Sequence, residues 1–456
     1  MPVNRAHLPP LGPDPSFRFP EIRRRVLSNG LRVWTVEHHA VSLVSFLALL
    51  PLGAAADPPE RPGLAALTGD MLDEGCGDLS ALELHDTLGR IGGHLDSEIG
   101  ADATLLTLSS LARFADRGAA LLADMIRRPR LEQRDFNRVR ELRLNRLVQM
   151  RDMAPALADR AYVQLLYPRH PYGHLSIGTE SALRSMLLRE VSAFHLAAFS
   201  PARLTVIASG DATHDELADL VDEAFGGWQA PQTSEEVVDA AALPLPAPAD
   251  ERLALVHRPE AAQSELRIGH VSVARSTPDY HALLVLNMIL GGQFVSRINM
   301  NLREDKGYTY GARTSFDFRR GAGPFTLQAS VQSDATADAV LEAIAEIAAI
   351  RATRPPTAKE LETGRAALTR GYPRNFETAE QISRAAAQLA LYGLPDDYFS
   401  TFVPKVLAIG ADDVTRVAHA HLDPARLLTV IVGDRDKVGP SLPRLNLGAV
   451  TEVTSV

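Results

Sequence analysis

The chain has 456 residues, of which 46% are hydrophobic and 23% charged, so it contains enough apolar material for a sizeable core. At roughly 100–200 residues per domain, this length predicts two or three domains. The formal net charge of −9 and the pI of about 5.9 exclude a nucleic-acid-binding protein that relies on a basic surface. Cys76 is the only cysteine, which excludes an internal disulfide and a zinc site built from several cysteines.

The beginning of the chain shows no targeting signal. Residues 1–25 are rich in proline and arginine and lack the apolar segment of a signal peptide. The longest apolar stretch, residues 41–56, is too short to span a bilayer and contains Pro51 and Gly53, so we interpret it as a buried strand followed by a turn. We therefore expect a cytoplasmic protein with no membrane partner, or a periplasmic one if a leader precedes the given sequence.

An internal repeat organises the rest of the chain. Residues 201–211 resemble residues 424–434, and the match extends upstream to Val191 and Val414 at a constant offset of 223. Each copy is typical of a helix, a short turn that contains proline, and a buried strand that ends at Gly-Asp. Earlier strands also correspond between the two halves, at residues 31–36 and 103–110 in the first and at 253–256 and 323–331 in the second.

The repeat predicts two homologous domains and a tether. A segment rich in Pro, Ala and acidic residues separates the copies, and its composition is that of an extended linker. We place the domains at residues 20–229 and 252–440, with the linker at 230–251. Strands and long helices within each half predict an α+β fold in which a mixed, mainly antiparallel sheet is covered by helices.

Several motifs carry a family resemblance that spans nearly the whole chain. Residues 170–180 read His-Pro-Tyr-Gly-His-Leu-Ser-Ile-Gly-Thr-Glu, and residues 290–311 contain Leu-Gly-Gly followed by Leu-Arg-Glu-Asp-Lys-Gly-Tyr-Thr-Tyr-Gly. The chain in these places is similar to pitrilysin-type zinc metallopeptidases, family M16, of the subfamily B type. The resemblance implies two α/β-roll domains that together form half of a clam-shell.

The zinc motif of that family is absent. It is His-x-x-Glu-His, in which two histidines bind zinc and the glutamate acts as the general base. Ala66 stands where the first histidine belongs, Gly69 where the glutamate belongs and Asp70 where the second histidine belongs. The window in which the resemblance places the third ligand, residues 143–150, contains no carboxylate. The resemblance therefore implies that this chain holds no zinc. The alternative is a cluster of the carboxylates Asp70, Asp73 and Glu74, which could bind a hard cation.

Arg303 and Tyr310 are the residues that could still carry chemistry. A helix at 294–305, a turn at Gly307 and a strand at 308–318 could bring the two side chains to one point. An arginine can bind a peptide carbonyl, and a tyrosine hydroxyl can donate to a developing oxyanion. In the family, an Arg/Tyr pair with this spacing has that role, while the alternative is an arginine in a helix-terminal ion pair beside a packed tyrosine.

The resemblance implies a non-catalytic subunit of a heterodimer. A separate M16 chain with His-x-x-Glu-His would supply the zinc and the base, and this chain would bind a peptide or unfolded polypeptide and stabilise the oxyanion. One alternative is a non-enzymatic scaffold or peptide-binding protein, and another is an enzyme that acts alone with a different metal or nucleophile. We expect no cofactor in this chain and no nucleic-acid partner.

Overall fold

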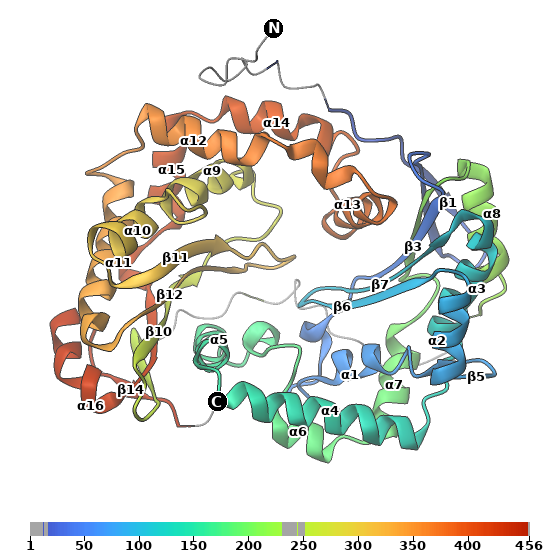
Figure 1. Ribbon diagram of the computed structural model, residues 1–456, viewed down its shortest axis with the longest axis horizontal. Coiled ribbons are helices and arrows are strands. Elements are labelled where there is room, and N and C mark those ends of the chain that lie inside the picture. Colours follow the sequence, from blue (N-terminus) through green and yellow to red (C-terminus); the bar gives the residue numbers. More distant parts are fainter. Residues whose placement is uncertain (1–11, 13–16, 230–243, 245–250, 455–456) are drawn as a thin grey trace, which may run out of the picture.

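The computed structural model describes residues 12, 17–229, 244 and 251–454. Two six-stranded mixed sheets dominate the structure, one in each half of the chain (Figure 1). Nearly all of the predicted linker at 230–251 lies outside the described residues. Within the described parts of the chain, no helix has the length and apolar character needed to cross a membrane.

The first sheet is mainly antiparallel, and only its β2–β8 pair is parallel. Its strands, in spatial order, are β1 (Arg23–Val26), β2 (Arg32–Glu37), β8 (Thr205–Gly210), β3 (Leu43–Leu50), β7 (Thr104–Leu111) and β6 (His94–Ile99). The helices of this half are α1 (Leu64–Asp70), α2 (Ala81–Arg90), α3 (Ala115–Arg127), α4 (Gln133–Arg151), α5 (Ala154–Leu166), α6 (Glu180–Ser185), α7 (Leu188–Ala198) and α8 (His214–Phe225). A small hairpin joins β4 (Gly75–Cys76) to β5 (Leu79–Ser80).

The second sheet repeats this design. Its strands, in spatial order, are β11 (Thr309–Phe316), β12 (Pro324–Gln332), β10 (Gln263–Val271), β13 (Leu428–Gly433), β9 (Leu253–His257) and β14 (Thr451–Glu452). Its helices are α9 (Tyr280–Leu290), α10 (Arg297–Asn299), α11 (Thr336–Arg351), α12 (Ala358–Thr369), α13 (Ala379–Tyr392), α14 (Tyr398–Ala408), α15 (Ala411–His421) and α16 (Arg435–Val438). The strand order β9-β13-β10-β12-β11 matches β2-β8-β3-β7-β6 of the first sheet.

The internal repeat is visible in the element bounds themselves. α7 and α15, like β8 and β13, begin and end 223 residues apart. β8 and β13 are buried along their whole length, and each pairs in parallel with the first long strand of its own half. A strand buried on both faces has little freedom to vary, because every side chain has a packing partner. This explains why the repeat is clearest in this part of the sequence.

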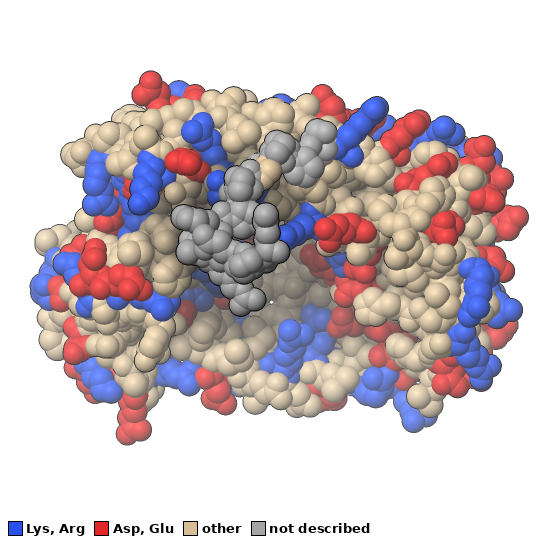
Figure 2. Space-filling view, turned by 45° about the horizontal axis from the view of Figure 1, so that its top comes forward, with Lys and Arg blue, Asp and Glu red and all other residues tan. Residues whose placement is uncertain are grey.

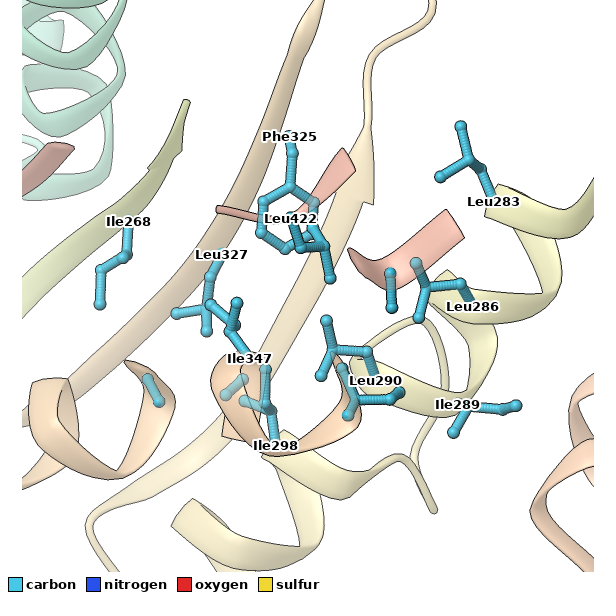
Figure 3. Close-up of a cluster of buried hydrophobic side chains, with 14 of the residues drawn as sticks. Ile268, Leu283, Leu286, Ile289, Leu290, Ile298, Phe325, Leu327, Ile347 and Leu422 are labelled. Carbon is cyan, nitrogen blue, oxygen red and sulfur yellow. The ribbon is translucent and has the colours of Figure 1, made fainter. Parts of the chain in front are cut away.

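The core of the second half lies between its sheet and its own helices (Figure 3). Ile268, Phe325 and Leu327 point from β10 and β12 toward one layer, since alternate residues of a strand face one side of the sheet. Leu286 of α9 and Ile347 of α11 complete this layer, and all five side chains are fully buried. The first half has an equivalent core between its sheet and α1, α3, α7 and α8.

The other face of each sheet is covered by a helix from the opposite half, which the sequence did not predict. Helix α5 belongs to the first half but packs on β10 and β13 of the second sheet, where Tyr162 donates a 2.9 Å hydrogen bond to the Phe325 carbonyl. Helix α13 belongs to the second half but packs on β3 and β8 of the first sheet, with Ala386 and Ala387 against Leu47. The two halves are therefore interlocked.

Candidate functional site

The lost zinc motif lies on α1, a short helix fixed at its start by a buried carboxylate. Asp57 Oδ2 and Oδ1 accept hydrogen bonds of 2.6 Å from the backbone nitrogens of Gly63 and Ala65, and His174 Nε2 lies 3.0 Å from Oδ2. Gly63 has a φ of 99°, in the left-handed region that favours glycine, so the chain can turn sharply into the helix. The helix that would present metal ligands is thus intact, although the ligands are missing.

The positions of the missing ligands are filled by other interactions. Ala66 is buried, and the Gly69 backbone packs so closely on β6 that a Cβ atom there would lie 2.8 Å from Ile99 Cδ1. Asp70 accepts a 2.5 Å hydrogen bond from the Arg143 guanidinium on α4, which also donates to the Ser176 carbonyl at 2.7 Å. A guanidinium bound to the one available carboxylate disfavours a metal cation at the same place. These residues therefore do not fit a zinc ion.

The neighbouring carboxylates do not make a substitute metal site. Glu74 forms an ion pair with Arg138. Burial, with the charges of Glu74 and Asp70 nearby, raises the pKa of Asp73 to about 6, so this carboxyl gains a proton more readily than an exposed one. In the chain from residue 17 to 229 and from 251 to 454, no three His, Cys, Asp or Glu side chains are grouped to hold a metal ion.

The second candidate region surrounds the turn between a helix and the edge strand β11. The sequence predicts one helix at 294–305, but the structure has only the short α10 followed by a π-helix at Met300–Asp305. π-Helical segments are rare in proteins, and those that occur are often found at functional sites. Gly307, with a φ of 68°, turns the chain into β11, and the backbone nitrogen of Tyr308 bonds to the Leu302 carbonyl at 2.8 Å.

A β-bulge then places Tyr310 outside the regular ladder. The pairing of β11 with β12 shifts register between Thr309 and Ala312, which leaves Tyr310 and Gly311 without cross-strand partners. The bulge is held on both sides, because the Thr309 hydroxyl accepts a 3.0 Å bond from the Gly311 nitrogen and Asn299 Oδ1 accepts one of 3.0 Å from the Ala312 nitrogen. The Tyr310 side chain is 87% exposed as a result.

Arg303 reaches Tyr310, but through the backbone. Its Nη1 donates a 2.9 Å hydrogen bond to the Tyr310 carbonyl, its Nε lies 3.1 Å from Glu304 Oε1, and its guanidinium carbon is 4.6 Å from the centre of the Phe294 ring. The Tyr310 hydroxyl bonds to no described residue. The expected approach of the two residues is present, although the expected meeting of the two side chains is not. The neighbouring Glu304 pair shows that the ion-pair alternative also describes part of the geometry.

Arg303 borders an open cavity of about 590 Å³ on the inner face of the second sheet. Gly311, Arg313 and Gln328 line it on the side of the strands, and Asp159 of α5 lines it on the side of the first half. Arg267, which is almost fully buried, ion-pairs with Asp159 at 2.6 Å in the same cavity. Figure 2 shows the surface hollowed between the two halves, with both acidic and basic side chains at the rim.

Two residues that the sequence analysis overlooked support this site. Asn299 anchors the bulge and also donates a 2.6 Å bond to the Phe294 carbonyl. Phe294 is 56% exposed and lies against the Arg303 guanidinium, where its ring restricts the orientation of that side chain. The signals available were a buried asparagine within a helical run and an aromatic residue directly after Gly-Gly, and neither indicates a site without the tertiary structure.

Two models of protein families match this chain. Residues 32–173 match the family described as Insulinase (Peptidase family M16), and residues 187–368 match the one described as Peptidase M16 inactive domain. The chain belongs to peptidase family M16. The resemblance inferred from the motifs is confirmed.

Relatives within family M16 have names of both kinds. An uncharacterised zinc protease of Mycobacterium tuberculosis is 26% identical over 421 residues, which cover 90% of this chain and 93% of that protein. The non-peptidase homologue YmxG of Helicobacter pylori is 21% identical over 392 residues, which cover 84% of this chain and 88% of that protein. Because these names differ, whether this chain can bind zinc is judged from Ala66, Gly69 and Asp70 and not from the names of its relatives.

Solved structures share the M16 fold over most of their length. A peptidase M16 inactive domain from Pseudomonas fluorescens superposes with a TM-score of 0.83 at 21% identity, covering 91% of this chain and 98% of that one. A protease from Helicobacter pylori superposes with a TM-score of 0.84 at 18% identity, covering 91% and 99%. The predicted α+β class, with two domains whose mixed sheets are covered by helices, is confirmed.

Proposed function

We propose that this chain is the zinc-less subunit of a two-chain M16 peptidase. A partner chain with His-x-x-Glu-His supplies the zinc ion and the general base, and this chain binds the substrate and stabilises the oxyanion with Arg303 and Tyr310. The observation that carries the proposal is a contrast within the molecule. At the former zinc site, Asp70 is engaged in a partly buried ion pair with Arg143, whereas Arg303 and Tyr310 are held at an open edge beside a cavity.

The substrate in this proposal is a peptide or an unfolded segment. Within the described residues, β6 and β11 are edge strands that each pair on one side only, and both lie toward the middle of the molecule (Figure 1). An extended peptide can add to such an edge through backbone hydrogen bonds and place alternate side chains in pockets. Tyr310 projects from the bulge of β11, so its hydroxyl is free to donate to a carbonyl oxygen of a peptide bound along that edge.

A scaffold or peptide-binding protein without a catalytic role is the second candidate. The name of the Helicobacter pylori relative, a non-peptidase homologue, is compatible with it. A scaffold does not need an exposed tyrosine on a bulge with an arginine fixed beneath it. The two candidates differ in turnover: the scaffold binds peptide and hydrolyses none with any partner chain.

The test is peptidase activity of the reconstituted complex. Co-purification and mass measurement first establish whether the chain forms a heterodimer with an M16 chain that carries His-x-x-Glu-His. Arg303→Ala and Tyr310→Phe are then expected to reduce kcat by about 10²–10³-fold, the effect of losing one oxyanion donor. Tyr308→Phe, at the half-buried neighbouring tyrosine, and Arg444→Ala, at an exposed arginine outside the cavity, are matched controls with unchanged activity.

Three results would contradict the proposal. Full activity of both variant complexes would show that the pair does not act on the substrate. Turnover by the isolated chain would assign the chemistry to this chain alone. Peptide binding without turnover, in the presence of an active M16 partner, would favour the scaffold.

A further inference from the structure

A second cavity, of about 470 Å³, lies away from the Arg303 site in the second half of the chain. Its wall is formed by the segment that follows β10, the first turn of α9, and helices α14 and α15. Three basic side chains line it, those of Arg275, Lys405 and Arg416, together with the His281 imidazole and the Asp279 carboxylate. Nothing in the proposed peptidase role uses this cavity.

Arg275 is unusual among the buried arginines of this protein. Four arginines in the described residues are at least nine-tenths buried, and Arg143, Arg267 and Arg297 each form an ion pair with a carboxylate. Arg275 is 7% exposed, yet no described carboxylate lies within ion-pair distance of its guanidinium. A buried charge without a counter-charge is costly, so its retention in a cavity wall calls for an explanation.

The protein holds the Arg275 guanidinium in a fixed position without neutralising it. Nη2 donates a 2.6 Å hydrogen bond to the Tyr398 hydroxyl. The guanidinium carbon lies 3.5 Å from the centre of the Tyr280 ring and 5.0 Å from that of Tyr398. The aromatic faces stabilise the cation and fix its plane. No described residue accepts from Nε and Nη1, so these donors remain for a group in the cavity.

None of the other polar groups that line the cavity supplies a negative charge that neutralises Arg275. Asp279 already binds Arg416 at 2.8 Å and His421 at 2.7 Å. His281 Nε2 is buried and has no hydrogen-bond partner in the structure. Burial, followed by the charges of Lys405 and Arg275, lowers the pKa of His281 to about 4, so the ring is neutral near pH 7 and the local potential is positive.

We infer that this cavity is a binding site for the phosphate group of a small molecule. Arg275 would offer guanidinium N–H groups that no described residue uses, Lys405 a mobile ammonium group, and His281 a ring nitrogen that lacks a partner. The two cations without a carboxylate partner, Arg275 and Lys405, suit a dianion better than a monoanion. The phosphate is free inorganic phosphate or part of a phosphorylated metabolite, and both sources share this chemistry.

Calorimetric titration of the purified chain tests the inference, with inorganic phosphate, pyrophosphate and acetate as probes. Phosphate and pyrophosphate are expected to bind saturably, and acetate at least about tenfold more weakly. The exposed Lys405 is the first target, since Lys405→Ala is expected to weaken phosphate binding by about tenfold or more without affecting the fold. Lys359→Ala removes another exposed lysine, outside the cavity, and is the matched control with unchanged affinity.

Arg275→Lys keeps the charge but removes the planar guanidinium and its several N–H donors, and it is also expected to weaken phosphate binding. Because Arg275 is buried, circular dichroism is used to check that the Arg275→Lys variant is folded. If that variant unfolds, Lys405→Ala alone still tests the inference.

Tighter binding of pyrophosphate than of phosphate supports a phosphorylated metabolite, and equal binding supports free phosphate. Absence of saturable phosphate binding, equal affinity for acetate, or unchanged affinity of Lys405→Ala would overturn the inference. None of these results depends on a peptidase partner, so the inference and the proposed function fail separately.

Discussion

The ion pair at the former zinc site gives the sharpest prediction for stability. The Arg143 side chain is 10% exposed, and Asp70 and the Ser176 carbonyl are its hydrogen-bond partners in the described structure. Asp70→Ala removes the counter-charge and leaves the guanidinium buried. A hydrogen bond to a charged group contributes about 1.5–3 kcal/mol, and a fully buried charge that loses its partner costs about 3–5 kcal/mol. Because the Asp70 side chain is 36% exposed, water can enter the vacated position, and we expect a loss of about 2 kcal/mol.

The opposite single variant is expected to cost less. Arg143→Met leaves Asp70 unpaired, but this carboxylate is partly exposed and can be solvated. Replacing both residues, as Asp70→Leu with Arg143→Met, exchanges the pair for apolar side chains of similar volume, and such exchanges are often close to neutral. The order of stability is therefore wild type and double variant, then Arg143→Met, then Asp70→Ala.

Urea unfolding measures these differences through the midpoint at an unchanged slope. A chelator should leave the midpoint of the wild-type chain unchanged, because the pair and not a metal holds the site. If Asp70→Ala lies within about 0.5 kcal/mol of wild type, the ordinary range for a surface substitution, the pair does not stabilise the fold as argued. If Arg143→Met is the more damaging change, the burial argument is wrong.

Other predictions concern the contacts between the halves and an acid-sensitive pair. Gly269→Ala should destabilise the protein by about 4 kcal/mol or more, since a Cβ there collides with the Phe325 carbonyl oxygen and the Tyr162 hydroxyl; a normal urea midpoint would refute this. Tyr162→Phe loses two buried hydrogen bonds, to the Phe325 carbonyl and from the Thr326 hydroxyl, and should cost about 1–3 kcal/mol by the same measurement, whereas no change would show that these bonds are not needed. Burial raises the pKa of Glu360, but the hydrogen bonds from Arg297 and from the helix start lower it to about 2 from the ordinary 4.5. Its stabilisation is therefore complete above pH 4.5 and lost as the pH falls toward 2, and Glu360→Gln should flatten this part of a stability–pH profile.

The repeat was the part of the fold that the sequence predicted best. Strands such as β8 and β13 are buried throughout, so their residues vary little and the offset of 223 remains visible. The exchange of α5 and α13 could not be predicted in this way. Ala158 and Tyr162 on α5 mark an apolar face, but nothing in the local pattern says which sheet that face covers.

Some features of the candidate site could be predicted from the sequence, and others required the fold. The loss of the zinc ligands follows from residue identities alone, so Ala66, Gly69 and Asp70 were recognisable in the sequence. The pairing of Asp70 with Arg143 joins residues 73 positions apart and required the fold. Likewise, the turn after Arg303 was predicted, whereas the bulge that turns Tyr310 outward depends on Asn299 and on the register of two strands.

The exchanged helices also limit how this molecule can move. A hinge between the halves would have to pull α5 off β10 and β13 and α13 off β3 and β8, and would expose two apolar surfaces at once. The free-energy cost of such a motion would be close to that of partial unfolding. The chain therefore behaves as one rigid shell. In the proposed two-chain peptidase, a long substrate would be admitted by separation of the two chains, while each keeps its own shape.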